Sequence, residues 1–216
     1  MFFRKAYAFA PYLLKKIRKS ITGPSTKTSR IDKPYDSQFV SFFMSPTHVY
    51  DVMGVSFLLG SGWNSMDAFQ SDTLYDLHIN CSALDIACGQ CIKNSIDFFI
   101  HDDNRVNLLS KQNLIKLQAT INAVYNILLQ PSNIECEKKK ILFTCWVGAS
   151  RSCCILLIVL IVILKKRLKI KSLQNETFEN AFLQLYNQIK ASRGCVSLNT
   201  KLYEDAIYLL KNDLLK

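Results

Sequence analysis

Residues 141–165 read ILFTCWVGASRSCCILLIVLIVILK, and the rest of the chain is organised around this stretch. Its pattern predicts a short buried strand over 141–143, a tight loop over 145–152, and then an apolar helix. The loop places Cys145 and Arg151 six positions apart, between the end of a strand and the start of a helix. Loops at strand ends often carry function, so this junction is the first candidate site.

The loop has the composition of an anion-binding site. Gly148 permits the positive φ that lets consecutive backbone N–H groups converge on one point, and the dipole of the following helix adds positive potential there. Arg151 offers a planar, permanently charged guanidinium to two phosphate oxygens. Cys145 would lie beneath the anion, where thiols ionise readily, because cysteines at helix N-termini have pKa values of roughly 3.5–7.5. The loop thus combines a phosphate site with a nucleophile.

This arrangement resembles a known family signature. Cys-x5-Arg, with glycine at the third position after the cysteine and the ending Ser150-Arg151-Ser152, resembles the cysteine-dependent protein phosphatases, in particular their dual-specificity branch. The alternative is a buried cysteine and a surface arginine beside a core helix, which would explain neither Gly148 nor the spacing.

Other segments resemble the same family. LGS at 59–61 and NCS at 80–82 are similar to the ends of two of its strands. RGCVSLN at 193–199 is similar to the connection between its last helices, with Leu198 in place of the usual proline. The resemblance extends, in order, over about residues 45–214.

The resemblance implies an α/β fold, with a central mixed, mostly parallel sheet flanked by helices and the phosphatase loop between a central strand and a helix. The hydrophobic patterns fit this arrangement. They predict further strands over 55–61, 77–82 and 96–100, and helices over 64–74, 108–129, 172–191 and 199–214.

The family mechanism assigns roles to the loop residues. It implies that Cys145 attacks phosphorus to give a cysteinyl-phosphate intermediate, that Arg151 binds the phosphate, and that Ser152 assists departure of the thiolate. It requires no metal and no other cofactor. Backbone N–H groups of the loop would bind the phosphate, which makes the following residues substrate-binding candidates: Trp146, Val147, Gly148, Ala149 and Ser150. Trp146 and Val147 are bulky, and would either narrow the loop or form an apolar lip.

The general acid is sought in the loop after the 96–100 strand. The family pattern places this aspartate two residues after an apolar strand residue and about five before the polar-apolar pair that opens the next helix. That pattern selects Asp102 over Asp103, with Ile100 before it and Asn107-Leu108 after it. The alternative is that both aspartates are helix-capping or solvated loop acids.

The resemblance implies a dual-specificity protein phosphatase that hydrolyses phosphotyrosine and phosphoserine/threonine in a phosphorylated protein substrate. The family usually has histidine before the cysteine, where this chain has Thr144. A weak or inactive phosphate-binding pseudophosphatase is therefore an alternative. Phosphatases of RNA 5′-triphosphate or phosphoinositides share the loop and are a third. Phosphoinositide phosphatases tend to carry lysines in the loop, and this loop has none. The RNA branch usually has asparagine before the arginine, where this chain has Ser150.

The charge of the chain is concentrated at one end. The net charge of the 216 residues is +10, and residues 1–31 hold eight basic residues and no acid, which leaves +2 for the remainder. We expect residues 1–38 to be a basic extension and linker, and 39–216 to be the catalytic domain. Residues 1–31 suit contact with an anionic membrane surface or nucleic acid, organelle targeting, or a disordered arm.

The eight cysteines favour a reducing compartment over a disulfide framework. The sequence lacks the pattern of a secretory signal, and a chain of this size does not need disulfides for stability. The expected location is intracellular, cytoplasmic or nuclear, unless the basic N-terminal residues direct the chain to a membrane surface or an organelle. The longest apolar run is about a dozen residues, typical of a core helix and too short for a membrane span.

Overall fold

The computed structural model describes residues 45–62, 64, 75–82, 94–98, 100, 108–130 and 138–215. The chain divides into two units, Met1–Pro34 and Tyr35–Lys216, and every described residue belongs to the second. Three of the sequence-based expectations lie outside the described residues: Asp102, the domain boundary at residue 38, and nearly all of the helix over 64–74. These three assignments stay predictions.

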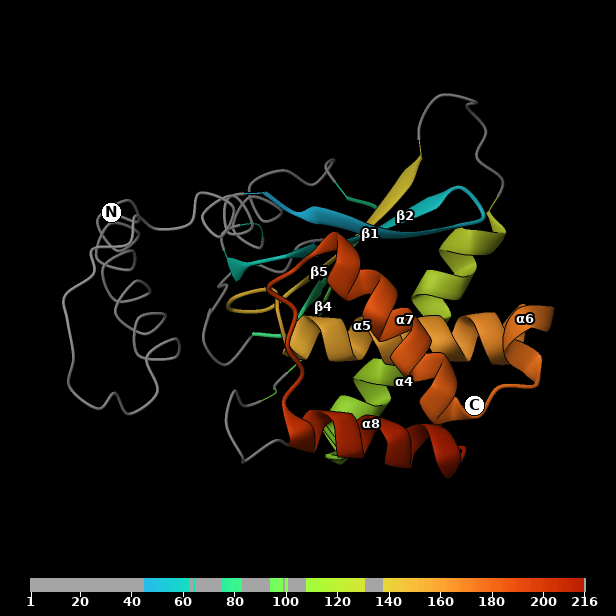
Figure 1. Cartoon of the computed structure of the whole chain (residues 1–216). Coiled ribbons are helices and arrows are strands. Elements are labelled where there is room, and N and C mark those ends of the chain that lie inside the picture. Colours follow the sequence, from blue (N-terminus) through green and yellow to red (C-terminus); the bar gives the residue numbers. More distant parts are fainter. Residues whose placement is uncertain are drawn as a thin grey trace, which may run out of the picture. The chain divides into compact units, whose positions relative to one another are not determined.

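The sheet of the described part has the strand order β1-β2-β5-β3-β4 (Figure 1). Only the β1–β2 pair is antiparallel, and the other neighbouring strands are parallel. The predicted α/β fold with a mixed, mostly parallel sheet is confirmed. The strands are β1 (Thr47–Val52), β2 (Val55–Gly60), β3 (Leu77–Asn80), β4 (Ser95–Asp97) and β5 (Lys139–Thr144).

One helix is enclosed by the others. Helix α5 packs against β2 and β5 and also contacts α4, α7 and α8 (Figure 1). All eleven of its residues are buried, which explains why its sequence is apolar on every side. The helical elements are α4 (Lys111–Leu129), α5 (Arg151–Ile161), the π-helical η1 (Val162–Arg167), α6 (Lys171–Gln174), α7 (Phe178–Ser192) and α8 (Thr200–Lys211). Within the described residues, no helix combines the length and the apolar character needed to cross a membrane.

Two elements differ from the sequence-based prediction. Strand β1 was not predicted. It is half-exposed, and its pairing with β2 is irregular between His48 and Tyr50. Its sequence therefore shows only a weak alternation of apolar and polar residues. The single helix predicted over 172–191 was wrong. The chain forms α6 and α7 there, and the Thr177 side chain accepts a hydrogen bond from Asn180 N and so starts the second helix.

The sheet register brings three strand ends to the same level. Both Gly60 of β2 and Asn80 of β3 pair with Thr144 of the central strand β5. Cys81 N donates to Thr144 O over 2.7 Å, and Cys145 N donates to Gly60 O over 3.4 Å. The two neighbouring turns therefore flank Cys145, at the carboxyl edge of the parallel strands where α/β folds place ligands.

Candidate active site

The loop between β5 and α5 is bent at Gly148. This residue has a φ of 74°, in the left-handed region that glycine adopts without strain. An added Cβ would overlap Gly60 O and lie 2.7 Å from Nη2 of Arg193. Both the backbone conformation and the lack of space therefore require glycine here.

Four donors surround the sulfur of Cys145. Gly148 N and Ser152 Oγ each lie 3.2 Å from Sγ. The backbone N–H groups of Ala149 and Ser152 also form hydrogen bonds to this thiol. The side chain is 3% exposed, so these groups take the place of solvent around the sulfur. The loop thus brings its amides together above Cys145, as its sequence predicts.

The surroundings of Cys145 favour the thiolate. Burial alone would raise its pKa, but the positive charge of Arg151, the Ser152 hydroxyl and the amides of Ser152 and Ala149 outweigh burial and lower the pKa below its ordinary value. Burial raises the pKa of the other described thiols, which are those of Cys81, Cys153, Cys154 and Cys195. Among the described cysteines, Cys145 is therefore the one whose surroundings favour the thiolate.

We predict that Cys145 is alkylated by iodoacetamide at neutral pH faster than a free cysteine. The lowered pKa leaves a larger thiolate fraction at pH 7, and the rate falls as the pH drops through that pKa. Ser152→Ala removes a hydrogen bond to the thiolate and should move the midpoint to higher pH. The pH profile of alkylation, followed by mass spectrometry with Cys145→Ser as the control, measures both. A midpoint equal to that of a free cysteine in wild type would contradict the assignment.

Arg151 is held beside the sulfur and not turned outward. It begins α5, is 1% exposed, and donates from Nη1 to Ile100 O over 3.0 Å. The first turn of α5 contains no acidic residue that would compete for this charge or for the helix dipole. In the sequence, Ile100 precedes Asp102, the predicted general acid, by two positions.

The carbonyl groups of the loop are bonded to the surrounding protein. Trp146 O accepts from Gly62 N over 3.2 Å, and Ala149 O accepts from Ser197 N over 3.2 Å. The carbonyls of Val147 and Gly148 are also hydrogen-bonded to other parts of the chain. Since each carbonyl points away from the N–H of the next residue, these bonds help to direct the N–H groups inward. Trp146 is buried and Val147 half-buried, so Val147 is the better placed of the two to contact a substrate.

No protein-family model matches the sequence, and no curated protein matches it. Among solved structures, the chain is similar to the Yvh1 phosphatase domain from Chaetomium thermophilum, with a TM-score of 0.51 at 13% identity, over 78% of this chain and 97% of that one. It is also similar to DUSP15, with a TM-score of 0.50 at 15% identity, over 78% and 94% of the two chains. The chain has the dual-specificity phosphatase fold. In this version of the fold, Cys145, Gly148, Arg151 and Ser152 come together at one point.

Arg193 is a part of the site to which the sequence assigned no role. Its guanidinium is fully buried and donates from Nε to Gly148 O over 2.9 Å and from Nη2 to Val147 O over 3.3 Å. Nη1 donates to Leu59 O and to Thr47 Oγ1, over 3.2 and 2.7 Å. One side chain therefore fixes the loop to β2 and β1. The sequence did contain a hint of this role, because Arg193 is the first residue of the 193–199 segment, which resembles the connection between the last helices of the family.

We predict that Arg193→Lys destabilises the loop although it keeps the charge. Lysine cannot reproduce the planar set of contacts, and each buried acceptor left unpaired costs about 1–3 kcal/mol. We expect a lower free energy of unfolding in urea and a higher pKa for Cys145, measured from its alkylation profile. Arg167→Lys is the matched control, since Arg167 contacts Asn122 and Tyr125 away from the loop. Unchanged stability and an unchanged thiol pKa would show that Arg193 does not position the loop.

The residue before the nucleophile is bonded to a buried histidine. Nε2 of His78, on β3, lies 2.8 Å from Oγ1 of Thr144, and both side chains are buried. Burial lowers the pKa of His78 to about 4, so the imidazole is neutral at pH 7. An imidazole from a neighbouring strand thus contacts the side chain of the residue before Cys145.

His78 should make folding stability depend on pH. Its pKa is lower in the folded than in the unfolded state, so its contribution is complete above about pH 6.5 and is lost as the pH falls toward 4. We predict that the free energy of urea unfolding decreases over this window in wild type. His78→Phe should flatten the slope, whereas Thr144→Ser, which keeps the imidazole and a hydroxyl, should retain it. An equal slope in His78→Phe and wild type would exclude His78 as its source.

Proposed function

We propose that the chain is a protein phosphatase that hydrolyses phosphotyrosine and phosphoserine/threonine through a cysteinyl-phosphate intermediate. The observation that carries the proposal is the contact set of the Cys145 sulfur, with Gly148 N and Ser152 Oγ each at 3.2 Å and a pKa that is lowered despite burial. The fold shared with the Yvh1 phosphatase domain and DUSP15 supports the same chemistry.

The first step transfers phosphate to sulfur. The phosphate dianion binds to the loop amides and to the Arg151 guanidinium, which stabilise the charge that develops on its oxygens. The Cys145 thiolate attacks phosphorus, and the S–P bond forms as the bond to the leaving oxygen breaks. Asp102, which follows the Arg151 contact at Ile100, gives its proton to that oxygen. The products of this half-reaction are the dephosphorylated hydroxyl and cysteinyl phosphate.

The second step restores the enzyme. Asp102, now a carboxylate, takes a proton from a water molecule that attacks phosphorus, and the S–P bond breaks to release inorganic phosphate. The Ser152 hydroxyl is 3.2 Å from the sulfur and can donate to the departing thiolate, which lowers the cost of its negative charge. The proposed cycle uses Cys145, Arg151, Ser152 and Asp102 and requires no metal ion.

We predict that the wild-type protein hydrolyses p-nitrophenyl phosphate. Cys145→Ser should lower turnover to background, because an alcohol at this site does not ionise. Arg151→Lys should lower kcat by about 10²- to 10³-fold, as loss of a donor to transition-state charge does. The assay follows p-nitrophenolate release, and a gel-shift or mass measurement after rapid quenching detects the phosphorylated cysteine. Wild-type turnover equal to that of Cys145→Ser, with retained phosphopeptide binding, would instead show a pseudophosphatase.

The neighbouring aspartates provide a matched control for the acid. Asp102→Asn removes the proposed proton donor and should lower kcat by about 10²-fold or more, with loss of the alkaline limb of the pH profile, on which activity falls as the acid ionises. Asp103→Asn makes the same chemical change one position later and should leave kcat within a fewfold of wild type. The reverse order of effects would move the general acid to Asp103.

A further inference from the structure

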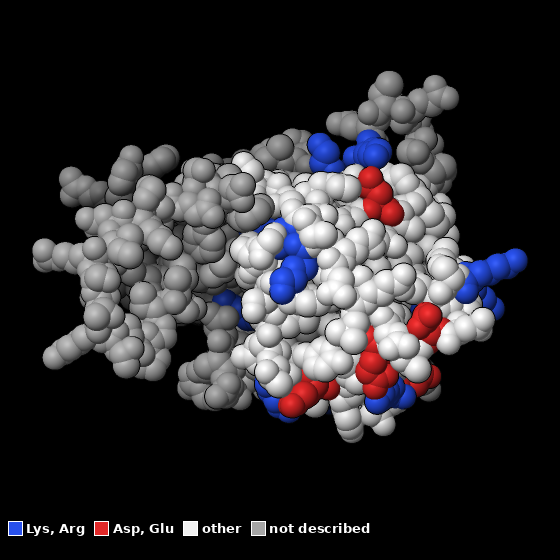
Figure 2. All heavy atoms as spheres, in the orientation of Figure 1, with Lys and Arg blue, Asp and Glu red and all other residues white. Residues whose placement is uncertain are grey.

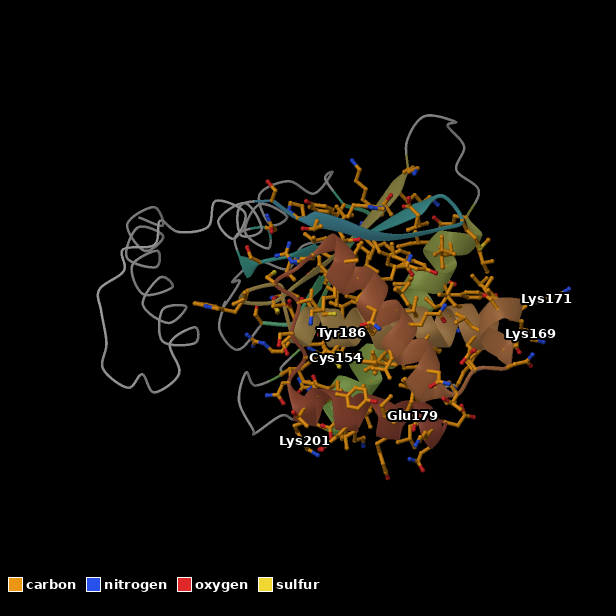
Figure 3. The ribbon with its side chains drawn as sticks, in the orientation of Figure 1. Cys154, Lys169, Lys171, Glu179, Tyr186 and Lys201 are labelled. Atoms are coloured by element: carbon orange, nitrogen blue, oxygen red, sulfur yellow. The ribbon has the colours of Figure 1, made fainter. Side chains whose placement is uncertain are left out.

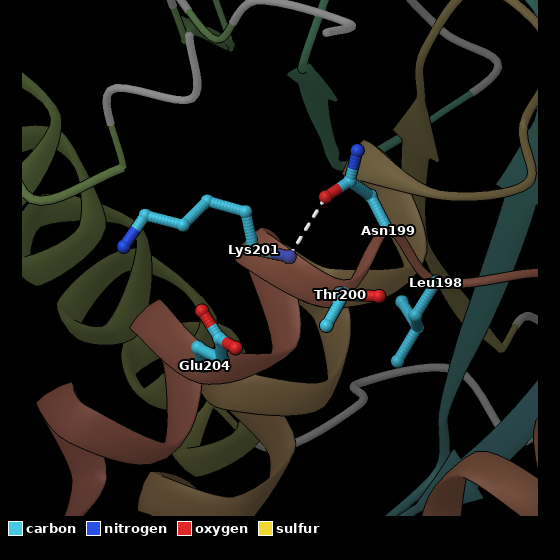
Figure 4. A pocket seen from close by; sticks show the side chains of 5 residues that line it. All are labelled: Leu198, Asn199, Thr200, Lys201 and Glu204. Atoms are coloured by element: carbon cyan, nitrogen blue, oxygen red, sulfur yellow. Dashed lines mark hydrogen bonds between the residues drawn. The ribbon is translucent and has the colours of Figure 1, made fainter. Parts of the chain in front are cut away.

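A pocket lies at the start of α8 and has no role in the chemistry above. It has a volume of about 460 Å³ and is lined by Leu198, Asn199, Thr200, Lys201 and Glu204 (Figure 4). We call it the 198–204 pocket. Its volume falls within the range of about 300–1,000 Å³ that is common for ligand sites. Figure 4 shows the side chains of Lys201 and Glu204 on the same side of the α8 terminus.

Two hydrogen bonds place the 198–204 pocket beside the phosphatase loop. Ser197 N donates to Ala149 O over 3.2 Å, and Asn199 N donates to Ser150 Oγ over 3.1 Å. The backbone that forms the pocket therefore contacts the loop at the two residues before Arg151.

The charge of the pocket favours a cationic ligand. Lys201 Nζ forms an ion pair with Asp205 Oδ1 over 2.8 Å, and the Asp205 side chain is only 3% exposed. Glu204 is exposed, and no ion pair to it is found within the described part of the chain. Asp205 does not line the pocket, but its ion pair with Lys201 offsets the one cation of the lining and leaves the carboxylate of Glu204.

The N-terminus of α8 offers little to an anion. Asn199 Oδ1 already accepts a hydrogen bond from Lys201 N over 2.8 Å, which caps the first turn (Figure 4). The exposed lysines at 169 and 171 lie away from Lys201, next to α6 (Figure 3). On the face shown in Figure 2, acidic and basic side chains alternate along the edge where α8 runs, with no continuous basic surface.

We propose that the 198–204 pocket binds a lysine or arginine side chain that flanks the phosphorylated residue of a protein substrate. Glu204 forms the ion pair with that side chain, and Leu198 contacts its aliphatic part. The inference rests on the proposed function, because it concerns the substrate of the same site. It adds a charge preference next to a site that is itself built for an anion.

The test compares phosphotyrosine peptides that differ only in one flanking residue, which is Arg or Glu, with the substitution placed in turn on each side of the phosphotyrosine. In wild type, kcat/KM for the Arg peptide should exceed that for the Glu peptide by about two- to fivefold on one side, the range of exposed ion pairs. The ratio should decrease at high salt. Glu204→Gln should bring it near one, and Glu204→Lys should invert it.

Glu176→Lys is the matched control, because it makes the same charge change between α6 and α7, away from the loop; it should keep the wild-type ratio. A ratio that is the same in wild type and Glu204→Lys would overturn the pocket assignment. Peptide affinities are measured in parallel with Cys145→Ser, which binds without turnover. An Arg preference in binding, combined with wild type that does not hydrolyse p-nitrophenyl phosphate, would refute the proposed function and retain the pocket.

Discussion

The structure depends on one electrostatic constraint, which is that a negative charge must be stable at a buried sulfur. Burial of Cys145 disfavours its thiolate, and the Arg151 charge, the Ser152 hydroxyl and the nearby amides more than offset this effect. Contacts of this kind act only over hydrogen-bond distances, so the loop must keep one conformation. The sheet register, the buried helix and Arg193 all serve to hold that conformation.

The packing of α5 explains how the helix contributes to the electrostatics. Because α5 is enclosed by β2, β5 and three other helices, its axis and its first turn have fixed positions. Its N-terminus lies next to Cys145, and the first turn contains no acidic residue. The positive end of the helix dipole is therefore available to the sulfur and to a bound phosphate. An apolar sequence thus contributes to the electrostatics of the site by fixing where the helix begins.

The arrangement of the loop could be predicted because it is local in sequence. Cys145, Gly148 and Arg151 lie within one short segment, and apolar runs marked most of the strands around it. The supporting contacts are not local: Arg193 reaches Gly148 across 45 positions, and His78 reaches Thr144 across 66. The spacing of apolar residues along the sequence carries no information about such long-range contacts. The same limit applies to β1, whose sequence alternation is weak because it is half-exposed and irregularly paired.

The way the loop is supported also explains how the fold persists at 13–15% identity. Four consecutive carbonyls, of residues 146–149, are bonded outward, and two of them are bonded to backbone N–H groups of Gly62 and Ser197. Backbone partners are available whatever the side chains are, so half of this support does not require particular residues. Arg193 is the side chain that binds the other two. The cost of orienting the amides toward the Cys145 sulfur is met during folding, so under the proposed function they need little reorientation to bind a phosphate.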